Sequence, residues 1–589
     1  MTDSKQQEAC NYERQVIAAA ATIPSDARHS GSPKASANRR ELCRAQRFDG
    51  AALLLILLIA GLAHAFTARA DDTKPPAQTP PMGWNDWAHY QCGFTALTIL
   101  SNARALVKSG LAAHGYDTVT IDDCWMLKER DAAGNLQVDS ERFPQGIKAV
   151  AETVHGLGLK FGIYEDAGYL TCGGFAGSGE PKGGGKDHFL QDAKLFASWG
   201  VDYLKLDGCN VYVPPGGSEE FAYRKAYAAE AAALKEAGKP VAFSESAPAY
   251  FQNSPEWYDV LAWVRGYGQL WREGTDVYTF DPKKPDVSRF ESVLWNYAYN
   301  QPLGRFQKPD NWNDADFIIG GDRGMTLAET RTQLALWSMM SAPLILSSDV
   351  EKLDPKAIAI LSNDAVLAID QDALGQTANL VRRTASTDVL FKRLSGGDYA
   401  IAVSNRDVNT VHVEMTSADF GFNAGSRCRF DLQNLWTEKR QSAVSTLQTE
   451  VDPHDTQIWR VHASSSCAAP SRTGTITLTA NEKSHDFGFV GYTRCLSADG
   501  NAGACTATSG DRWTITPSGT LKSDGRCLTA IDGKPEMRSC SERAEQHWKY
   551  TLAGNLVSSN HQCLTGSASG LSLESCGHNQ PDQIWSLPN

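Results

Sequence analysis

Two aspartates stand where a barrel enzyme carries its chemistry. Asp207 ends the apolar, strand-like run Tyr203-Leu-Lys-Leu-Asp-Gly-Cys209 and is followed at once by glycine. The carboxyl end of a buried parallel strand is where (β/α)8 barrels hold their catalytic groups. A second candidate, Asp276, ends the run Trp271-Arg-Glu-Gly-Thr-Asp276. Two carboxylates on different strand ends can flank a glycosidic bond, one as nucleophile and the other as acid/base.

The elements that must position these aspartates follow a β-then-α rhythm from Pro80 to about Gly375. Apolar runs end in polar residues near Trp84-Asn85, Asp122-Asp123, Tyr164-Glu165, Asp207, Ser244-Glu245, Arg272, Asn313-Asp314 and Ser347-Ser-Asp349. Eight βα units in roughly 300 residues predict a (β/α)8 TIM barrel, an α/β fold. A doubly wound sheet would need a glycine-rich phosphate loop between a strand and a helix. The run Gly183-Gly-Gly185 stands in a polar stretch instead.

Length and charge limit the classes of function. The chain of 589 residues is too long for one ordinary domain, and its 42% hydrophobic and 21% charged residues are typical of a globular protein. The net charge of −12 argues against nucleic acid or an acidic membrane surface as the partner. A neutral substrate suits this charge, and no motif implies a cofactor.

The N-terminal segment predicts export. Residues 51–62 form an apolar run that is too short for a comfortable transmembrane helix. Arginines precede this run, and Ala63-His-Ala65 and Ala68-Arg-Ala70 follow it with the small residues of a cleavage site. We therefore expect residues 1–70 to be a signal peptide cleaved after Ala70, or an uncleaved N-terminal anchor. The protein would be secreted or periplasmic, with the catalytic barrel spanning 71–375.

Cysteine usage agrees with export. The chain has 14 cysteines, and only Cys10 and Cys43 precede the apolar run. The others would lie on the exported part, where oxidation to disulfides is expected. No pair has the Cys-x-x-Cys spacing typical of zinc sites, so no metal site is predicted.

The pattern changes after the barrel. Residues 376–461 contain short alternating runs such as Val389–Lys392 and Tyr399–Ser404, which predict an antiparallel β-sandwich. Residues 462–480 are rich in Ser, Ala and Thr and are interpreted as a linker.

An internal repeat fills residues 481–589. Its three units open with Cys-Leu-Ser or Cys-Leu-Thr, carry a second cysteine 10 or 13 residues later and close with tryptophan. This register predicts a threefold β-trefoil with a tryptophan core. One disulfide would hold each unit: Cys495–Cys505, Cys527–Cys540 and Cys563–Cys576.

Several motifs together resemble glycoside hydrolase family 27, the α-galactosidase (melibiase) family. They are Thr79-Pro-Pro-Met-Gly-Trp-Asn-Asp-Trp87, Ile121-Asp-Asp-Cys-Trp125, Lys160-Phe-Gly-Ile-Tyr164, Tyr203-Leu-Lys-Leu-Asp-Gly-Cys209, Trp271-Arg272 with Asp276, Trp312-Asn-Asp-Ala-Asp316 and Ala342-Pro-Leu344. They recur in family order over about residues 79–375. The last carboxylate motif, Asn313-Asp-Ala-Asp316, departs slightly from the family pattern, which usually has proline in place of Ala315.

The resemblance implies a retaining, exo-acting α-galactosidase. Asp207 would be the nucleophile that forms a covalent glycosyl intermediate, and Asp276 the acid/base. Retaining enzymes hold the two carboxyl groups about 5–5.5 Å apart. Lys205 would lie on the same strand face as Asp207 and stabilise its negative charge, or else form a surface ion pair.

The resemblance also implies a galactose pocket. Asp122 and Asp123 would accept hydrogen bonds from the 4- and 6-hydroxyls of the sugar, although a paired acidic site can also bind a metal. Trp84 would form a wall of the pocket, or else belong to the barrel core. The remaining polar contacts would come from Tyr164, Arg272 and Asp316. By the same resemblance, Cys92–Cys124 and Cys172–Cys209 would be disulfides, while the pairing of Cys428 and Cys467 stays open.

Other functions stay open at this point. Ser246, Ala249 and Tyr250 occupy the loop that would face the 2-position of the sugar. The small pair Ser246 and Ala249 resembles the α-N-acetylgalactosaminidase branch, whose pocket admits an acetamido group. Hydrolysis of another α-linked glycan is a further alternative, and a non-catalytic carbohydrate-binding protein is the alternative from another class.

The trefoil resembles a ricin-B-type carbohydrate-binding module, which could bring the enzyme to an α-galactoside oligosaccharide or polysaccharide. The aspartate that usually follows Cys-Leu in such modules is replaced by Ser497, Thr529 and Thr565. A folded trefoil that binds sugar weakly or not at all is therefore the alternative.

Overall fold

The computed structural model describes residues 76–589 except 253, 423–426, 479–493 and 568–569. The expected signal or anchor at 1–70 lies outside the described residues. All described residues belong to one compact unit of the chain. In this part of the chain, no helix combines the length and apolar character needed to cross a membrane.

Parallel strands form the first sheet, in the order β7-β6-β5-β4-β3-β2-β1-β8. In the described part of the chain these are β1 (Met82–Asn85), β2 (Thr118–Ile121), β3 (Lys160–Asp166), β4 (Tyr203–Asp207), β5 (Ala242–Glu245), β6 (Leu270–Arg272), β7 (Trp312–Asp314) and β8 (Leu344–Leu346). Ile318, just after β7, closes the ring, since its N–H donates to Ile345 at 2.8 Å and its carbonyl accepts from Ser347 at 2.9 Å. The predicted (β/α)8 barrel is confirmed.

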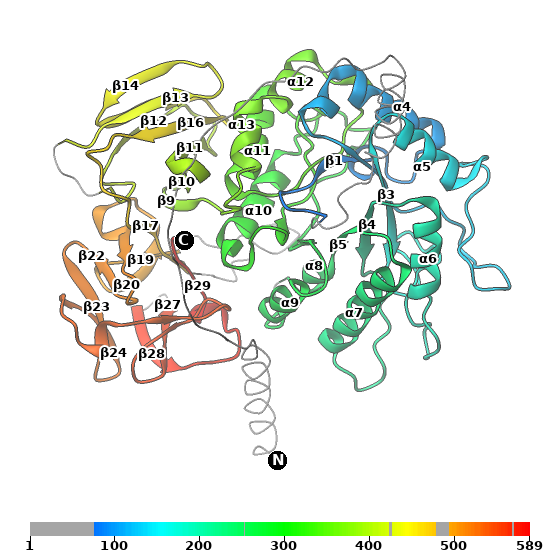
Figure 1. Ribbon diagram of the computed structural model, residues 1–589. Helices are drawn as coiled ribbons and strands as arrows, with labels where there is room; N and C mark the ends of the chain where they lie inside the picture. The colour runs from blue at the N-terminus through cyan, green and yellow to red at the C-terminus, as the bar shows by residue number, and fades with distance from the viewer. Residues whose placement is uncertain (1–75, 253, 423–426, 479–493, 568–569) are drawn as a thin grey trace, which may run out of the picture. The chain divides into compact units, whose positions relative to one another are not determined.

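Helices follow the strands and cover the outside of the barrel, as α6 and α7 do for β3 and β4 (Figure 1). They are α3 (Trp87–Tyr90), α4 (Ala96–Ser109), η1 (Leu111–His114), α5 (Gly146–Gly156), α6 (Phe189–Trp199), α7 (Glu219–Ala237), α8 (Ala247–Phe251), α9 (Trp257–Val264), α10 (Phe290–Asn300), η2 (Gln301–Phe306), α11 (Leu327–Met340), η3 (Val350–Lys352), α12 (Pro355–Leu361) and α13 (Asp364–Asp370). Residues at its ends fix where α7 begins and stops. At the start, the Ser218 hydroxyl caps the helix by accepting from the Phe221 N–H at 3.2 Å. Gly238 ends it at φ +80°, a conformation that costs glycine little.

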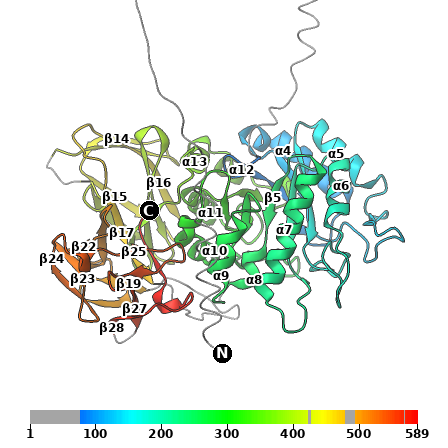
Figure 2. The same cartoon turned by 60° about the horizontal axis from the view of Figure 1, so that its bottom comes forward.

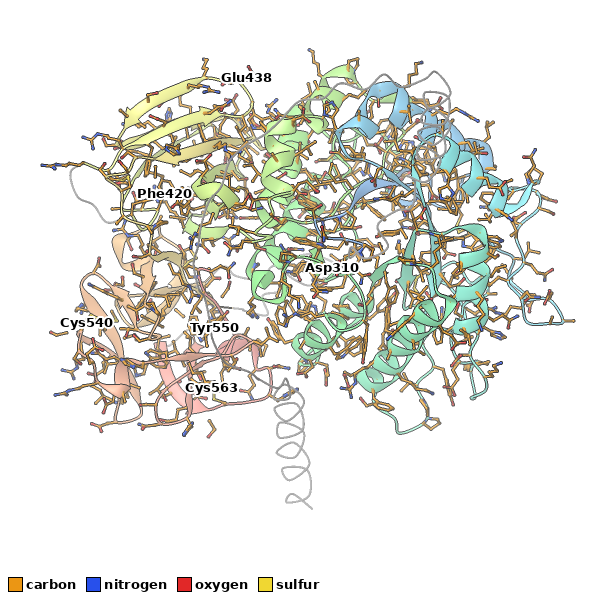
Figure 3. All side chains as sticks on the ribbon, viewed as in Figure 1. Asp310, Phe420, Glu438, Cys540, Tyr550 and Cys563 are labelled. Atoms are coloured by element: carbon orange, nitrogen blue, oxygen red, sulfur yellow. A yellow bond between two sulfur atoms is a disulfide. The ribbon has the colours of Figure 1, made fainter. Side chains whose placement is uncertain are left out.

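Antiparallel strands form the predicted sandwich. They are β9 (Asn379–Arg383), β10 (Thr387–Arg393), β11 (Tyr399–Asn405), β12 (Val411–Thr416), β13 (Phe430–Asn434), β14 (Arg440–Val444), β15 (Thr446–Val451) and β16 (Thr456–Ala463), with η4 (Ser395–Gly397). β12 and β15 pair with each other, and the other strands form the order β14-β13-β16-β11-β10-β9. Phe420, labelled in Figure 3, packs on Phe391 and Phe430 in the core between them.

One lysine of the sandwich reaches into the barrel. Lys392 on β10 is buried, and its ammonium donates to the carbonyls of Ser338 at 2.7 Å and Ile369 at 2.8 Å and to the Ser341 hydroxyl at 2.6 Å. Burial lowers the pKa of Lys392 to about 8, against the opposing charge of Asp370. The acceptors all lie on or beside α11 and α13.

Short strands form the trefoil (Figure 2). They are β17 (Arg472–Thr475), β18 (Thr477–Leu478), β19 (Arg494–Ser497), β20 (Asn501–Ala504), β21 (Arg512–Ile515), β22 (Leu521–Ser523), β23 (Arg526–Ile531), β24 (Lys534–Ser539), β25 (Lys549–Tyr550), β26 (Leu556–Val557), β27 (Gln562–Ser567), β28 (Gly570–Ser575) and β29 (Trp585–Ser586), with η5 (Ser509–Asp511), η6 (Ala544–Gln546) and η7 (Pro581–Gln583).

The repeat has a structural counterpart in each trefoil unit. The indole N–H groups of the buried Trp513, Trp548 and Trp585 donate to the carbonyls of Leu496, Leu528 and Leu564 at 2.7, 3.0 and 2.8 Å. Each of these leucines directly follows the first cysteine of its unit. The predicted sandwich and trefoil are both confirmed.

The segment expected as a linker differs from a plain connection. Within 462–480, β17 pairs with β21, and β18 pairs with both β19 and β29. Ile476 and Leu478 are fully or almost fully buried. The Thr-rich composition that suggested a loop therefore forms strands, because threonine is β-branched and these apolar neighbours fill the trefoil core.

Candidate active site

The carboxyl ends of the barrel strands enclose a cavity of about 520 Å³. Most of the expected site residues line this cavity: Asp122, Asp123, Tyr164, Lys205, Asp207, Ser246, Ala249, Tyr250, Arg272 and Asp276. They come from β3, β4 and β6, from the segments that follow β2, β5 and β6, and from helix α8, which follows β5 and carries Ala249 and Tyr250. A barrel brings such positions together because every parallel strand ends at the same face.

Asp207 ends β4 and accepts hydrogen bonds from two tyrosines. Tyr250 donates its hydroxyl to Oδ1 at 2.5 Å, and Tyr164 donates to Oδ2 at 3.2 Å. Burial and the negative charge of Asp207 raise the pKa of both tyrosines well above the usual value. Both hydroxyls therefore stay protonated and hold the carboxylate in one orientation.

Lys205 provides a buried positive charge beside Asp207. Its ammonium donates to Asp122 Oδ2 at 2.7 Å and lies 5.2 Å from the centroid of the Tyr164 ring. Burial lowers the pKa of Lys205, but the charges of Asp122 and Asp207 outweigh that effect and raise it overall. Lys205 is thus a buried cation of the site, and the surface ion pair considered for it does not describe its position.

The paired aspartates have fixed orientations. Asp122 Oδ2 also accepts from the Asn85 amide at 2.7 Å, which leaves the carboxylate held between Asn85 and Lys205. Asp123 accepts from the Cys124 N–H at 2.6 Å and the Gly173 N–H at 2.7 Å. Burial raises the pKa of Asp123, while these backbone donors oppose the rise.

Arg272 links the expected acid/base to a buried carboxylate. Its guanidinium donates to Asp276 at 2.9 Å and pairs with Asp316, also at 2.9 Å. The Asp276 side chain is 68% exposed, whereas that of Asp316 is 1% exposed. Asp276 therefore faces the open side of the cavity. It is held there by Arg272, which is itself paired with the buried Asp316. Asp316 does not line the cavity; it accepts the Val277 N–H at 2.6 Å and holds the chain after Asp276.

Trp84 requires a correction. Its side chain is fully buried and its indole N–H donates to the Ser348 carbonyl at 2.8 Å, so it belongs to the barrel core and not to the cavity. Trp87, which starts α3 directly after β1, lines the cavity instead. Both tryptophans stand in the same motif, and only the direction of a four-residue strand and the turn after it separates their roles.

Disulfides border the site. Cys172 and Cys209 are joined and line the cavity, and the Tyr250 hydroxyl lies 3.1 Å from Cys209 Sγ. Asp166, Asp207 and the two sulfurs place possible ligand atoms within 4.8 Å of one another. Sulfurs joined in a disulfide offer no thiolate to a metal, so this cluster is suited to holding the strand ends and not an ion. The structure also joins Cys92–Cys124, Cys428–Cys467 and the three pairs expected in the trefoil.

Family models match the chain in three consecutive segments: "Alpha galactosidase A" at residues 79–372, "Alpha galactosidase C-terminal beta sandwich domain" at 384–461 and "Ricin-type beta-trefoil lectin domain" at 478–585. A probable α-galactosidase A of Aspergillus clavatus is 37% identical over 523 residues, which covers 87% of this chain and 94% of the relative. The chain belongs to the α-galactosidase A family. The resemblance to glycoside hydrolase family 27 is confirmed, and the chain is a glycoside hydrolase.

Further α-galactosidases are similar to this chain in sequence and in structure. The α-galactosidase of Cyamopsis tetragonoloba is 34% identical over 378 residues, covering 64% of this chain and 84% of its own. The crystal structure of α-galactosidase I from Mortierella vinacea matches with a TM-score of 0.57 at 28% identity, covering 67% of this chain and 98% of that one.

Some residues that line the cavity were not predicted from the sequence. Besides Trp87, they include Trp295 on α10, Phe317 after β7, and Val277, Tyr278 and Thr279 after Asp276. Phe317 directly follows Asp316, the last residue of a motif that resembles the family. Its place next to that motif could have predicted its position in the cavity. Trp295 sits inside a helix whose buried residues occupy most of its circumference, and no pattern separates its cavity-facing position from a core position.

Proposed function

We propose that this protein is a retaining, exo-acting α-galactosidase that hydrolyses terminal non-reducing α-D-galactosides through a covalent glycosyl–Asp207 intermediate. One observation carries the proposal: Asp207 and Asp276, from the ends of β4 and β6, line one cavity together with the Asp122–Asp123 pair and Lys205. Two carboxylates at one glycosidic bond are the requirement of the retaining reaction.

In the first step, an Asp207 oxygen attacks the anomeric carbon as the glycosidic bond breaks. Asp276 gives its proton to the departing oxygen, and its exposed position suits contact with a leaving group at the cavity mouth. The hydrogen bonds from Tyr164 and Tyr250 orient Asp207 for the attack.

In the second step, Asp276 takes a proton from water as the water oxygen attacks the anomeric carbon. The ester bond to Asp207 breaks, and the released carboxylate is again stabilised by the two tyrosine hydroxyls and by the charge of Lys205. Two inversions leave the anomeric configuration retained.

Sugar recognition would rest on the Asp122–Asp123 pair, which lines the same cavity. Asp122 and Asp123 are held in fixed orientations by backbone and side-chain donors. In the proposal, their free lone pairs would accept hydrogen bonds from the 4- and 6-hydroxyls. A rigid acceptor pair discriminates between epimers because the wrong epimer leaves buried acceptors without partners. Trp87 takes the place given to Trp84 as the aromatic wall.

An assay on three parallel substrates tests the proposal. The purified protein is incubated with p-nitrophenyl α-D-galactopyranoside, its α-glucoside and its 2-acetamido-galactoside. Faster cleavage of the galactoside supports the proposal, and NMR of the first sugar released should show the α-anomer. Silence on all three substrates would contradict it and favour a non-catalytic carbohydrate-binding protein.

The second candidate is an α-N-acetylgalactosaminidase. The observation that favours it is the position of Ser246 and Ala249, two small side chains that both line the cavity beside Tyr250. Their size leaves room where an acetamido group at the 2-position would need it. Faster cleavage of the 2-acetamido substrate would select this candidate.

We expect the double variant Ser246→Glu/Ala249→Leu to lose cleavage of the 2-acetamido-galactoside by at least roughly 10-fold relative to the galactoside, since added side-chain volume and charge exclude the acetamido group. The ratio of kcat/KM for the two substrates measures this. Lys194→Ala on the outer helix α6 is the control and should leave the ratio unchanged. An unchanged ratio in the double variant would show that Ser246 and α8 do not face the 2-position.

In two trefoil units, the threonine that replaces the usual sugar-binding aspartate is bonded within the fold. The hydroxyls of Thr529 and Thr565 are buried, and they accept from the Gln546 and Gln583 amides at 3.0 Å. Each hydroxyl also donates to a cysteine carbonyl, from Thr529 to Cys527 and from Thr565 to Cys563. These groups serve the fold, which favours the weak or silent alternative in these two units.

Export to the secreted or periplasmic space completes the proposal. The disulfides at the cavity and in the trefoil are stable in an oxidising compartment and not in a reducing one.

A further inference from the structure

The third trefoil unit contacts a barrel helix beside the site. Asn579 is 6% exposed, and its amide donates to the Pro255 carbonyl at 2.7 Å and to Asp259 at 3.1 Å. The neighbouring His578 reaches the same Asp259 carboxylate at 2.7 Å. Asp259 lies in the first turn of α9, and Pro255 lies two residues before the helix begins (α9 and β28 are labelled in Figure 1). A buried amide whose donors are used on another domain is a specific contact, because an unpaired amide there would be costly.

A second contact holds the same helix. Arg305 of η2 donates to the carbonyls of Leu552 and Ala553 in the trefoil at 2.7 and 2.9 Å. Its guanidinium also lies 5.6 Å from the centroid of the Tyr258 ring on α9. The trefoil therefore meets the start of α9 directly, through Asn579, and indirectly, through Arg305.

The same helix contacts the loop that carries Asp276. The indole N–H of Trp257, the first residue of α9, donates to the Glu273 carbonyl at 2.8 Å. The Gln252 side chain, just after α8, accepts from the Thr275 N–H at 3.2 Å. A side-chain carbon on Gly274 would lie 2.4 Å from the Gln252 amide nitrogen, so the loop fits closely on this segment.

We propose that the trefoil positions the Asp276 loop through α9, with Asn579 and His578 as positioning residues. The contacts form a continuous path: Asn579 to Pro255 and Asp259, Trp257 to Glu273, and then along the loop from Glu273 to Asp276, three residues later. Arg272 holds the far side of this loop through the Gly274 and Thr275 carbonyls and Asp276 itself. The trefoil is thereby part of the hydrolase's working structure, independently of any glycan it binds.

The inference deepens the proposed function, because its catalytic consequence depends on Asp276 being the acid/base. Proton donation to the leaving group falls off when the donor is misplaced by a fraction of an ångström to an ångström. Loosening the loop should therefore slow substrates with poor leaving groups more than substrates whose leaving group needs no proton.

The variant that tests the path is His578→Ala/Asn579→Gly in the full chain. Asn579 has φ +46°, and glycine adopts that conformation without strain, so the substitution removes the amide and spares the turn. Lys534→Ala, at an exposed position of β24 in another trefoil unit, is the matched control.

Hydrogen–deuterium exchange gives the readout that does not depend on activity. The amides of Thr275 and Val277 donate to Gln252 and Asp316, and they should exchange faster in the double variant than in the control. Exchange at residues 273–277 that matches the control would overturn the proposal, whatever the enzyme cleaves.

The catalytic readout compares an α-galactoside oligosaccharide with a 2,4-dinitrophenyl α-galactoside. We expect kcat/KM to fall by roughly 10-fold for the first and less than about 2-fold for the second, because only the first needs the proton. Equal losses on both substrates would indicate a general loss of structure and overturn the proposal. A wild-type protein inactive on both would refute the proposed function, while the exchange result would still decide the positioning role.

Discussion

Asp207→Asn should abolish turnover of α-galactosides, with a loss on the order of 10⁴-fold or more, as expected for a missing nucleophile. The amide is too weak a nucleophile to attack the anomeric carbon, yet it keeps the shape of the side chain. Its carbonyl oxygen can still accept a hydrogen bond from Tyr250 or Tyr164, so the melting temperature should change little. Steady-state kinetics and thermal unfolding on the same preparation measure both effects.

The control for this variant is Asp202→Asn, which precedes the same strand at its opposite end. Asp202 accepts from the Phe161 N–H, Lys239 and His155 and has no place in the cavity. Its substitution should lower the melting temperature while kcat stays within a few-fold. Wild-type-like rates from Asp207→Asn would refute the assignment of Asp207 as nucleophile.

Asp276→Ala should separate substrates by their leaving groups. Loss of the general acid costs roughly 10²–10⁴-fold for substrates whose leaving group must be protonated. A 2,4-dinitrophenyl α-galactoside needs no proton, so its first step should proceed and the glycosyl–Asp207 intermediate should accumulate. A burst of dinitrophenol followed by slow turnover is the expected observation.

Azide gives the matching rescue. A small anionic nucleophile needs no general base, so azide should speed breakdown of the accumulated intermediate and yield α-galactosyl azide. Asp281→Asn, an exposed carboxylate downstream of the same loop, is the control and should show neither the burst nor the rescue. A uniform loss on both substrates with no azide effect would show that Asp276 is not the acid/base.

The barrel could be predicted from the sequence because its strand ends carry a strong local signal. Each apolar run stops at a polar residue, and the carboxylates at the end of β4 and after β2 and β6 reach one cavity because the strands are parallel. The trefoil could be predicted from the tryptophan repeat for a similar reason. Each closing indole hydrogen-bonds to the leucine in the opening Cys-Leu of its own unit.

The positions that could not be predicted depend on direction and packing. Trp84 and Trp87 differ only in which side of a short strand and turn each faces, and that is decided by the whole barrel. The carbonyl of Ser348, which binds Trp84, is 264 residues away in sequence. Asp316 was placed near the sugar, but it is buried beneath Arg272 because the backbone after Asp276 needs an acceptor there. The trefoil contacts of Asp259 follow no local pattern at all.

Lys392 of the sandwich hydrogen-bonds to the barrel helices, so the predicted domain boundary near residue 375 does not separate two independent cores. Along β10 and β11, Leu390 and Ala402 pack into the barrel's core, whereas Val389 and Val403 pack into the sandwich's own. The two strands thus serve as a shared wall, with alternate side chains belonging to different domains. The change from helices to strands near residue 375 divides the topology of the chain, but the apolar interior continues across it. The sandwich is in this sense the outer layer of the catalytic domain.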